Sequence, residues 1–508
     1  MSAAPSEPEK YSIDDMMDRL KSPPSEDPEA GELVTRADGS QAIRVRKRKR
    51  RSTQPHKDAV HRTRRSRILQ VSAALIVVFI TALSIGAAVI YANSSPFRQN
   101  LQRHIEQASG ATVEFQQFRM NPKTANAGVI SLKWPDGNVL QSLTLTGITA
   151  EIFPSSFLGK SMNGEEVTVG EGVLSLQIPK PGGILTNHAM SGEPSSIRFN
   201  RYRIPRFQLA LGDPRAPSIS LLKSEASLSP YNVSGRPLMS LYRGNLSVAG
   251  WPALRLDRAL LEFRGSEVDV IGLRILAPQD DRGSFELSGT VSPYKPDQLS
   301  TLAVNLDSFQ LAGLTGPALG RLVSGRIDTL PVAKSNYLSF KPSDSPDPTL
   351  DITYHAAPTS QIEVKGFPFL FALYQLLDDT WFERPVFESE TSGVFHRENG
   401  VVTLRNLQLE NKDRMALKGE ISIAADQTLS GTLDVGLAEG MILAANTPRL
   451  KSMFGPSKDG FRWVTLKISG PASAPSDNFK ELFSTATATP AAPAEIPRSS
   501  FEDLTRPK

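Results

Sequence analysis

The 508-residue chain contains no cysteine. Disulfide bonds, thiolate zinc sites and a thiol nucleophile are therefore excluded, and any exported part must be stabilised by burial of apolar surface. The chain also lacks a cationic excess outside its first 67 residues. Those residues carry 16 Lys and Arg against 11 Asp and Glu, and the remainder carries 41 against 42. Because nucleic-acid binding requires a dense cationic surface, we expect no nucleic-acid partner for the larger part of the chain.

Catalytic signatures are also missing. The sequence contains no GxSxG motif, and Gly159-Lys160-Ser161 has Pro154 where a Walker A motif requires glycine. The pairs Asp280-Asp281 and Asp378-Asp379 are adjacent in sequence, so their side chains diverge on a strand or a helix. No second histidine or carboxylate stands at metal-ligand spacing from the histidines that follow residue 92: His104, His188, His355 and His396. We predict that the protein is not an enzyme, with no catalytic residue, cofactor or metal ion.

Residues 68–92 contain no charged side chain. A helix of this length covers roughly 37 Å, more than the ~30 Å hydrocarbon core of a bilayer. Twelve Lys and Arg residues stand between Arg44 and Arg67, whereas only Arg98 follows closely. The positive-inside rule therefore predicts a transmembrane helix with a cytoplasmic N-terminus. A cleaved signal peptide is the alternative, but the late start of the run and the bulky Ile90 near its end favour an uncleaved signal-anchor.

Residues 1–67 are rich in Ser, Pro and charge, which predicts a disordered cytoplasmic tail. Within it, residues 12–21 have the pattern of a short amphipathic helix. Its apolar face consists of Ile13, Met16, Met17 and Leu20. Two interpretations stay open, a docking helix for a cytoplasmic protein partner and a transient helical turn without one.

Residues 93–470 are dominated by alternation of apolar and polar residues. A helix is predicted at Phe97–Ser109, closed by Gly110, and a second at residues 367–377. Strands fill most of the rest, with a change of parity at Gly147 and a hairpin turn at Asn399-Gly400. The predicted fold is mainly β, with a single transmembrane helix followed by an elongated antiparallel, twisted β-sheet and a few short helices. A short helix and an Ala/Pro-rich tail are expected at residues 471–508.

Three stretches of this region resemble the AsmA-like family of bacterial envelope proteins. They are SGATVEFQQF at residues 109–118, ISLKWPDGNVLQSLTLTGITAEI at 130–152, and the long run from FHRENGVVTL to GTLDVGL at 395–437. The pattern of the last run is an aromatic residue, an Asn-Gly turn, alternating leucines and a Lys-Gly-Glu-Ile strand. It rests on Phe395, Asn399, Gly400, Leu404, Leu407, Leu409, Met415, Leu417, Gly419, Ile421, Ile423, Leu433 and Val435. The long N-terminal tail departs from the family pattern.

The resemblance implies a bacterial inner-membrane protein, largely periplasmic, whose curled sheet holds acyl chains in an open apolar groove. Alternation alone is equally satisfied by a filled sandwich, and the sequence leaves this open. The predicted groove residues are Leu143, Leu145, Leu404, Leu407, Leu417 and Ile421. The expected function is to bind or conduct phospholipid or another lipid in support of outer-membrane and envelope biogenesis. The alternative is an envelope scaffold that binds protein partners on both sides of the membrane.

Overall fold

The computed structural model describes residues 32–44, 57–157, 162–180, 197–231, 233–330, 336–343, 347–388 and 391–487. The chain divides into two units, Met1–Ala82 and Leu83–Lys508. The predicted docking residues Ile13, Met16, Met17 and Leu20 lie outside the described residues. In the first unit, strands β1 (Glu32–Thr35) and β2 (Gln41–Arg44) form an antiparallel hairpin. The sequence interpretation placed no strand there, although Asp38-Gly39 is a turn signal and Gly39 has a φ of 78°.

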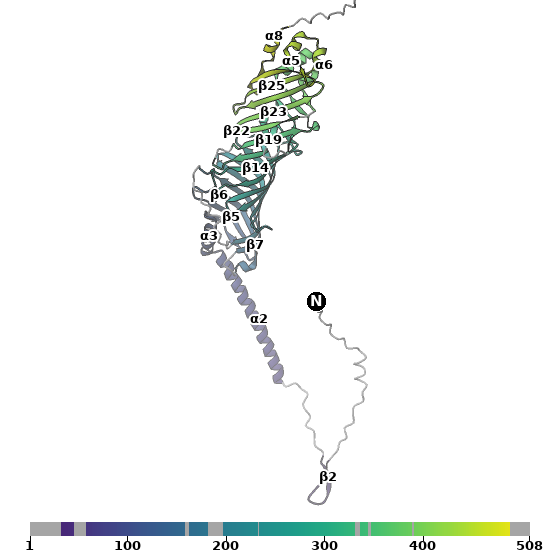
Figure 1. The fold of residues 1–508 in the computed structure, drawn as a ribbon. Helices are drawn as coiled ribbons and strands as arrows, with labels where there is room; N and C mark the ends of the chain where they lie inside the picture. Colours follow the sequence, from purple (N-terminus) through teal and green to yellow (C-terminus); the bar gives the residue numbers. More distant parts are fainter. Residues whose placement is uncertain are drawn as a thin grey trace, which may run out of the picture. The chain divides into compact units, whose positions relative to one another are not determined.

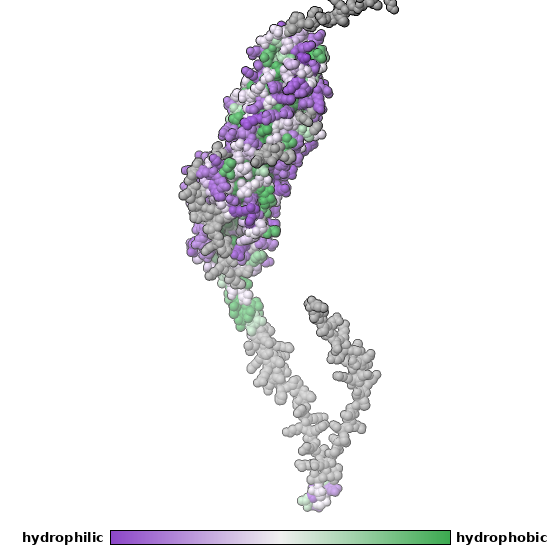
Figure 2. All heavy atoms as spheres, in the orientation of Figure 1, coloured by the Kyte–Doolittle hydropathy of each residue, from purple (hydrophilic) through white to green (hydrophobic). Residues whose placement is uncertain are grey.

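Helix α2 (Lys57–Ala92) ends at the predicted residue and begins before Ile68. Its apolar stretch, Ser72–Ala92, has a mean hydropathy of 2.7. Within the described residues it is the one helix that is long and apolar enough to span a membrane. Figure 2 shows the end of this stretch as a continuous hydrophobic surface. The predicted apolar run is therefore a helix of sufficient length for a membrane span.

The second unit contains helix α3 (Ser95–Ser109) and a large sheet (Figure 1). The first strands of this sheet are β3 (Thr112–Gln116), β4 (Arg119–Met120), β5 (Thr124–Lys133), β6 (Leu140–Ile152), β7 (Met162–Leu176), β8 (Ile197–Asp213), β9 (Ala216–Ser229), β10 (Leu238–Val248), β11 (Leu254–Arg264), β12 (Glu267–Leu276) and β13 (Ser284–Val291). A short 3-10 helix, η1 (Pro154–Phe157), links β6 to β7.

The later strands of the same sheet are β14 (Ser300–Asp307), β15 (Phe309–Gln310), β17 (Arg326–Thr329), β18 (Tyr337–Phe340), β19 (Thr349–Ala356), β22 (Thr391–Glu398), β23 (Val401–Asn411), β24 (Met415–Ile423), β25 (Thr428–Ala438), β26 (Ser457–Lys458), β27 (Phe461–Pro471) and β28 (Ser476–Asp477). A separate small sheet contains β16 (Val323–Ser324), β20 (Ile362–Val364) and β21 (Val386–Phe387). The helices between and after these strands are α4 (Ala312–Gly320), η3 (Pro358–Ser360), α5 (Pro368–Leu377), η4 (Thr380–Glu383), α6 (Glu439–Ala444), α7 (Pro448–Met453) and α8 (Phe479–Thr485).

The prediction of a mainly β fold with few helices is confirmed. Neighbouring strands follow chain order from β5 to β14 and again from β22 to β25, where they pair antiparallel except in one place. That exception is β7 and β8, which pair in parallel. Parallel neighbours require a long connection, and residues 177–196 provide it. The sheet is therefore mixed rather than wholly antiparallel.

Local signals set several of these elements. Gly110 closes α3 with a φ of 67°, and its N–H donates to the carbonyl of Glu106. Gly147 has a φ of 64° and interrupts the pairing of β5 with β6, which gives the change of parity predicted there. Asn399 and Gly400 both have positive φ, at 49° and 75°, as the hairpin between β22 and β23 requires.

The packing of the sheet changes along the chain. We name β3–β11 with α3 the N-terminal region and β14–β28 with α4–α8 the C-terminal region. In the C-terminal region one large core joins the apolar face of the sheet to every one of these helices. The helices contribute Leu314, Leu319, Phe369, Leu370, Leu373, Ile442, Leu450 and Phe479. The N-terminal region has three smaller clusters, to which the described helices contribute only Ala92 and residues of α3.

Candidate functional site

One row of leucines crosses the N-terminal region. Each member stands directly opposite the next in the strand register, from β5 to β11. The row is Leu132, Leu143, Leu174, Leu209, Leu221, Leu246 and Leu254. Direct neighbours in a sheet bring side chains within contact distance, so the seven leucines form a continuous apolar strip across seven strands.

Two further rows flank this strip on the same face. One contains Phe115, Ile130, Leu145, Gly172 and Phe207. The other contains Leu140, Leu176, Leu211, Ile219 and Val248. We name the three rows together the leucine face. Gly172 has no side chain, but the side chains of Ile204 and Leu145 cover its position in the row. A Cβ there would lie 3.0 Å from Ile204 and 3.3 Å from Leu145.

Much of the leucine face is only half-buried. Leu143, Leu174, Leu209 and Leu246 all remain partly accessible, although they lie in the middle of a wide sheet. Helix α3 packs over the first strands through Phe97 and Ile105. Beyond it, the cluster around Phe207 contains no residue of a described helix. Partly exposed apolar rows of this extent are typical of a surface that another apolar group covers.

The six predicted groove residues fall into two groups. Leu143 and Leu145 lie on β6 within the leucine face. The other four, Leu404, Leu407, Leu417 and Ile421, lie on β23 and β24, and each is at most 2% exposed. They belong to the large C-terminal core, where Leu404 stands opposite Ile421 and Leu407 opposite Gly419. The structure thus separates the two groups, and only the first retains accessible apolar surface.

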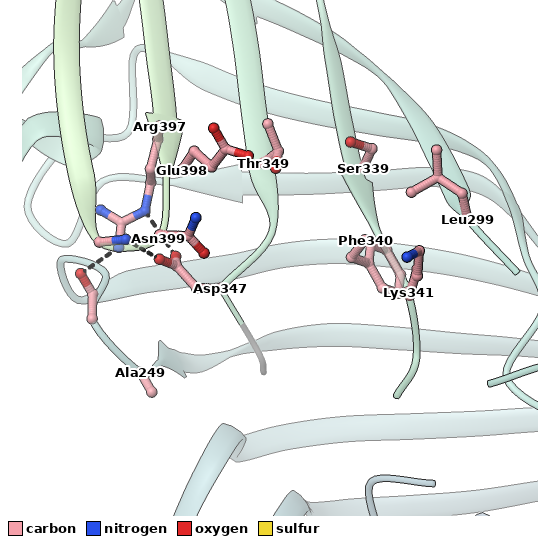
Figure 3. Close-up of a pocket in the computed structure, with 12 residues that line it drawn as sticks. Ala249, Leu299, Ser339, Phe340, Lys341, Asp347, Thr349, Arg397, Glu398 and Asn399 are labelled. Atoms are coloured by element: carbon pink, nitrogen blue, oxygen red, sulfur yellow. Dashed lines mark hydrogen bonds and ion pairs between the residues drawn. The ribbon is translucent and has the colours of Figure 1, made fainter. Parts of the chain in front are cut away.

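The two regions meet at a cavity of about 650 Å³ (Figure 3). Its lining includes Gly250 from the β10–β11 turn, Asp347 before β19, and Arg397 and Gly400 from the β22–β23 hairpin. Arg397 Nε donates to Asp347 Oδ1 at 3.2 Å, and Arg397 Nη2 donates to the Gly250 carbonyl at 2.8 Å. The Gly400 N–H donates to the other oxygen of Asp347. These bonds draw together turns that are far apart in the sequence.

Trp251 completes this junction. Its indole Nε1 donates to Asp347 Oδ1 at 3.2 Å, and the Arg397 guanidinium lies 4.7 Å from the centre of its ring. Arg397 is almost fully buried, with a side-chain exposure of 4%. A buried guanidinium with this many partners fixes geometry rather than being available for a ligand. The cavity also exposes Lys341 and Glu398, so its walls suit a polar occupant and not an acyl chain.

The closest approach to a catalytic arrangement lies on the opposite face of the C-terminal sheet. Tyr337, Asp351 and His396 stand side by side across β18, β19 and β22. His396 Nδ1 lies 2.8 Å from Asp351 Oδ1, and the hydrogen bond to Asp351 raises the pKa of Tyr337. Carboxylate, imidazole and protonated phenol form a polar cross-strand row without a serine or threonine nucleophile among the three. In the described residues no group of three or more His, Cys, Asp or Glu is placed to hold a metal ion.

Comparisons of this chain with protein-family models, with curated proteins and with solved structures find no match. The AsmA-like resemblance therefore stays a prediction from the sequence patterns. Sequence reasoning found the alternation at Leu174 and Leu209 but not their register, since pairing between strands has no local signal. The contacts among Trp251, Asp347 and Arg397 were missed for the same reason, because Asp347 lies 96 residues from Trp251 and 50 residues from Arg397 in the sequence.

Proposed function

We propose that the chain is a bacterial inner-membrane protein that binds lipid on the leucine face and supports envelope biogenesis. Helix α2 spans the membrane with its N-terminus in the cytoplasm, and the large sheet lies in the periplasm. The protein performs no catalysis. The bound group is an acyl chain of a phospholipid or another lipid, because the rows offer methyl groups and almost no hydrogen-bonding side chains.

The observation that carries this proposal is the row of leucines across β5–β11, in which Leu143, Leu174, Leu209 and Leu246 are half-buried while the other three are buried. Covering such a row with a hydrocarbon chain removes apolar surface from water at about 25 cal/mol per Å². The corresponding apolar rows on the C-terminal strands offer no such gain in buried surface, since helices α4–α8 already cover them. A scaffold role remains the second candidate, in which an apolar segment of a partner protein covers the leucine face.

Lipid that copurifies with the full-length chain tests the proposal. We expect the double variant Leu174→Glu, Leu209→Glu to lose most of the lipid that remains on the wild-type protein, because charges desolvated under an acyl chain are costly. Val173→Glu is the matched control, because Val173 lies on the same strand, is 36% exposed and points to the opposite face.

Circular dichroism establishes that each variant keeps its β structure. Lipid bound to α2 is common to all three proteins and cancels in the comparison. Equal lipid content in the double variant and the control contradicts lipid binding at the leucine face. A copurifying protein that is lost only from the double variant supports the scaffold role instead.

A further inference from the structure

The end of α2 is fixed to the edge of the sheet. Asn93 follows the apolar helix directly, and its side chain makes two hydrogen bonds with the backbone of Met120 on β4, each 2.8 Å long. Ring contacts continue the connection from Tyr91 to Phe97, with centroids 5.7 Å apart, and from Phe97 to Phe118. These hydrogen bonds and ring contacts therefore hold the first strands against the last turn of α2.

The chain direction shows which ends of the strands lie near α2. Helix α3 leads away from Asn93, and β3 begins at Thr112, which stands opposite Lys133 at the end of β5. Strand β4 then runs back toward α2 and ends at Met120, which stands opposite Ala125 at the start of β5. The β4–β5 turn therefore points back toward the helix. Figure 1 shows α3 and β7 next to the end of α2. We name this side of the sheet the near edge.

The register extends the near edge over six strands. The Ile152 N–H donates to the Lys123 carbonyl in the β4–β5 turn at 3.0 Å, and Ile152 stands opposite Gly164 on β7. Gly164 in turn stands opposite Phe199 on β8. On β9, Leu228 pairs with Tyr202, and Tyr231 follows the end of this strand at Ser229 by two residues. Phe153 and Tyr231 therefore both lie just beyond the near-edge ends of their strands, β6 and β9.

Among the described residues, the near edge has two strongly exposed aromatic side chains, whereas Trp134 in the far-edge connection between β5 and β6 is only partly exposed. Phe153 is 46% exposed and Tyr231 is 63% exposed. The far-edge turns, which join β5 to β6 and β8 to β9, contain Asp136, Gly137, Asp213, Pro214 and Arg215, all exposed. Strand β8 is 17 residues long, so the two edges are separated by roughly 50 Å of strand. Strongly exposed aromatic side chains at one edge and exposed polar turns at the other match the difference between a membrane interface and bulk water.

We propose that the near edge rests in the headgroup layer of the membrane that α2 crosses, with Phe153 and Tyr231 inserted among the lipids. The partner of this surface is a lipid bilayer. The inference rests on the membrane span in the proposed function, and it concerns a different surface from the leucine face. It gives the sheet a defined orientation, with its strands rising from the membrane.

The absence of cysteine makes a direct test available, because each single-cysteine variant accepts one spin label. The full-length chain is reconstituted into vesicles of phosphatidylethanolamine and phosphatidylglycerol. Labels are placed by Phe153→Cys, Tyr231→Cys, Arg215→Cys at the far edge and Leu83→Cys in α2. Collisions with oxygen, which concentrates in the bilayer, are compared with collisions with a water-soluble nickel chelate.

We expect labels at residues 153 and 231 to collide with the nickel chelate several-fold less often than the label at 215, with the label at 83 the least accessible to nickel. Nickel accessibility at 153 and 231 equal to that at 215 overturns the near-edge contact while leaving the membrane span intact. A label at 83 that is freely accessible to nickel overturns the membrane span, and the near-edge contact with it.

Discussion

The two regions of the sheet carry the same alternation of leucines but differ in what covers them. Leu174 in the N-terminal region is half-buried, whereas Leu404 in the C-terminal region has no exposed surface. The pattern on the strands is not the cause, because both leucines stand in apolar rows between paired strands. The cover comes from elsewhere in the chain. Alternation therefore decides which face of a sheet is apolar, and the connections decide whether that face is closed.

The connections differ between the regions. In the N-terminal region, β8 to β11 are joined by turns whose described residues form no helix, such as the one between Asp213 and Ala216. In the C-terminal region, helices stand after β15, β20, β25 and β28 and pack onto one core. The junction of Trp251, Asp347 and Arg397 lies where the two regions meet. One sheet thus combines a filled part with a part whose apolar face remains accessible.

The largest expected effect is on stability. We expect Leu404→Ala and Leu417→Ala each to lower the free energy of unfolding by about 2–5 kcal/mol, because each leaves a cavity in a closed core. Leu174→Ala and Leu209→Ala should cost only about 1 kcal/mol, since their side chains already contact solvent. Urea unfolding of the full-length chain in micelles, followed by circular dichroism, measures both pairs. Equal losses for the two pairs would mean that the leucine face is as closed as the core.

A smaller effect distinguishes a buried ion pair made with the C-terminal strand β17 from an exposed pair in the N-terminal region. Asp280 forms a two-point pair with Arg326, at 2.7 and 2.9 Å, and its side chain is 5% exposed. Arg203 and Glu225 on β8 and β9 form an exposed pair at 3.2 Å. We expect Asp280→Asn to cost about 2 kcal/mol near neutral pH and Glu225→Gln less than about 1 kcal/mol.

The pH dependence provides the control for this pair. The hydrogen bond from Arg326 lowers the pKa of Asp280 below its usual value of 3.8. Its contribution is therefore fully present above that value and is lost as the pH falls through the lower pKa of the folded state. The difference between wild type and Asp280→Asn should shrink in acid, whereas a difference independent of pH would contradict the ionic origin of the effect.

The sequence predicted the elements that have a local signal. The helix ending at Gly110, the hairpin at Asn399-Gly400 and the break at Gly147 all follow from backbone conformations that few residues adopt. The apolar helix α5 was also predicted, because ten residues at helical spacing suffice to show a period. Helices α6 and α7 were not, because each has six residues, too few for periodicity to separate them from a turn.

The candidate site was only partly predictable. Leu143 and Leu404 belong to strands that alternate in the same way, so the sequence pattern treats them alike. Their difference depends on helices α4–α8, which belong to the same core as Leu404 and not to the cluster around Leu143, and such long-range packing has no signature at either residue. The parallel pairing of β7 with β8, which aligns Leu174 with Leu209, follows from register across a long connection rather than from the strands themselves.

The central claim is that lipid contacts the leucine face and not the C-terminal core. A phospholipid with a photoreactive acyl chain, incorporated into membranes that contain the full-length protein, tests this most directly. After irradiation, peptide mass spectrometry locates the adducts. We predict adducts on α2 and on strands β5–β11, around Leu143, Leu174 and Leu209, and none on β23 and β24. Adducts confined to α2, or adducts around Leu404 and Leu417 without any on β5–β11, would contradict the account.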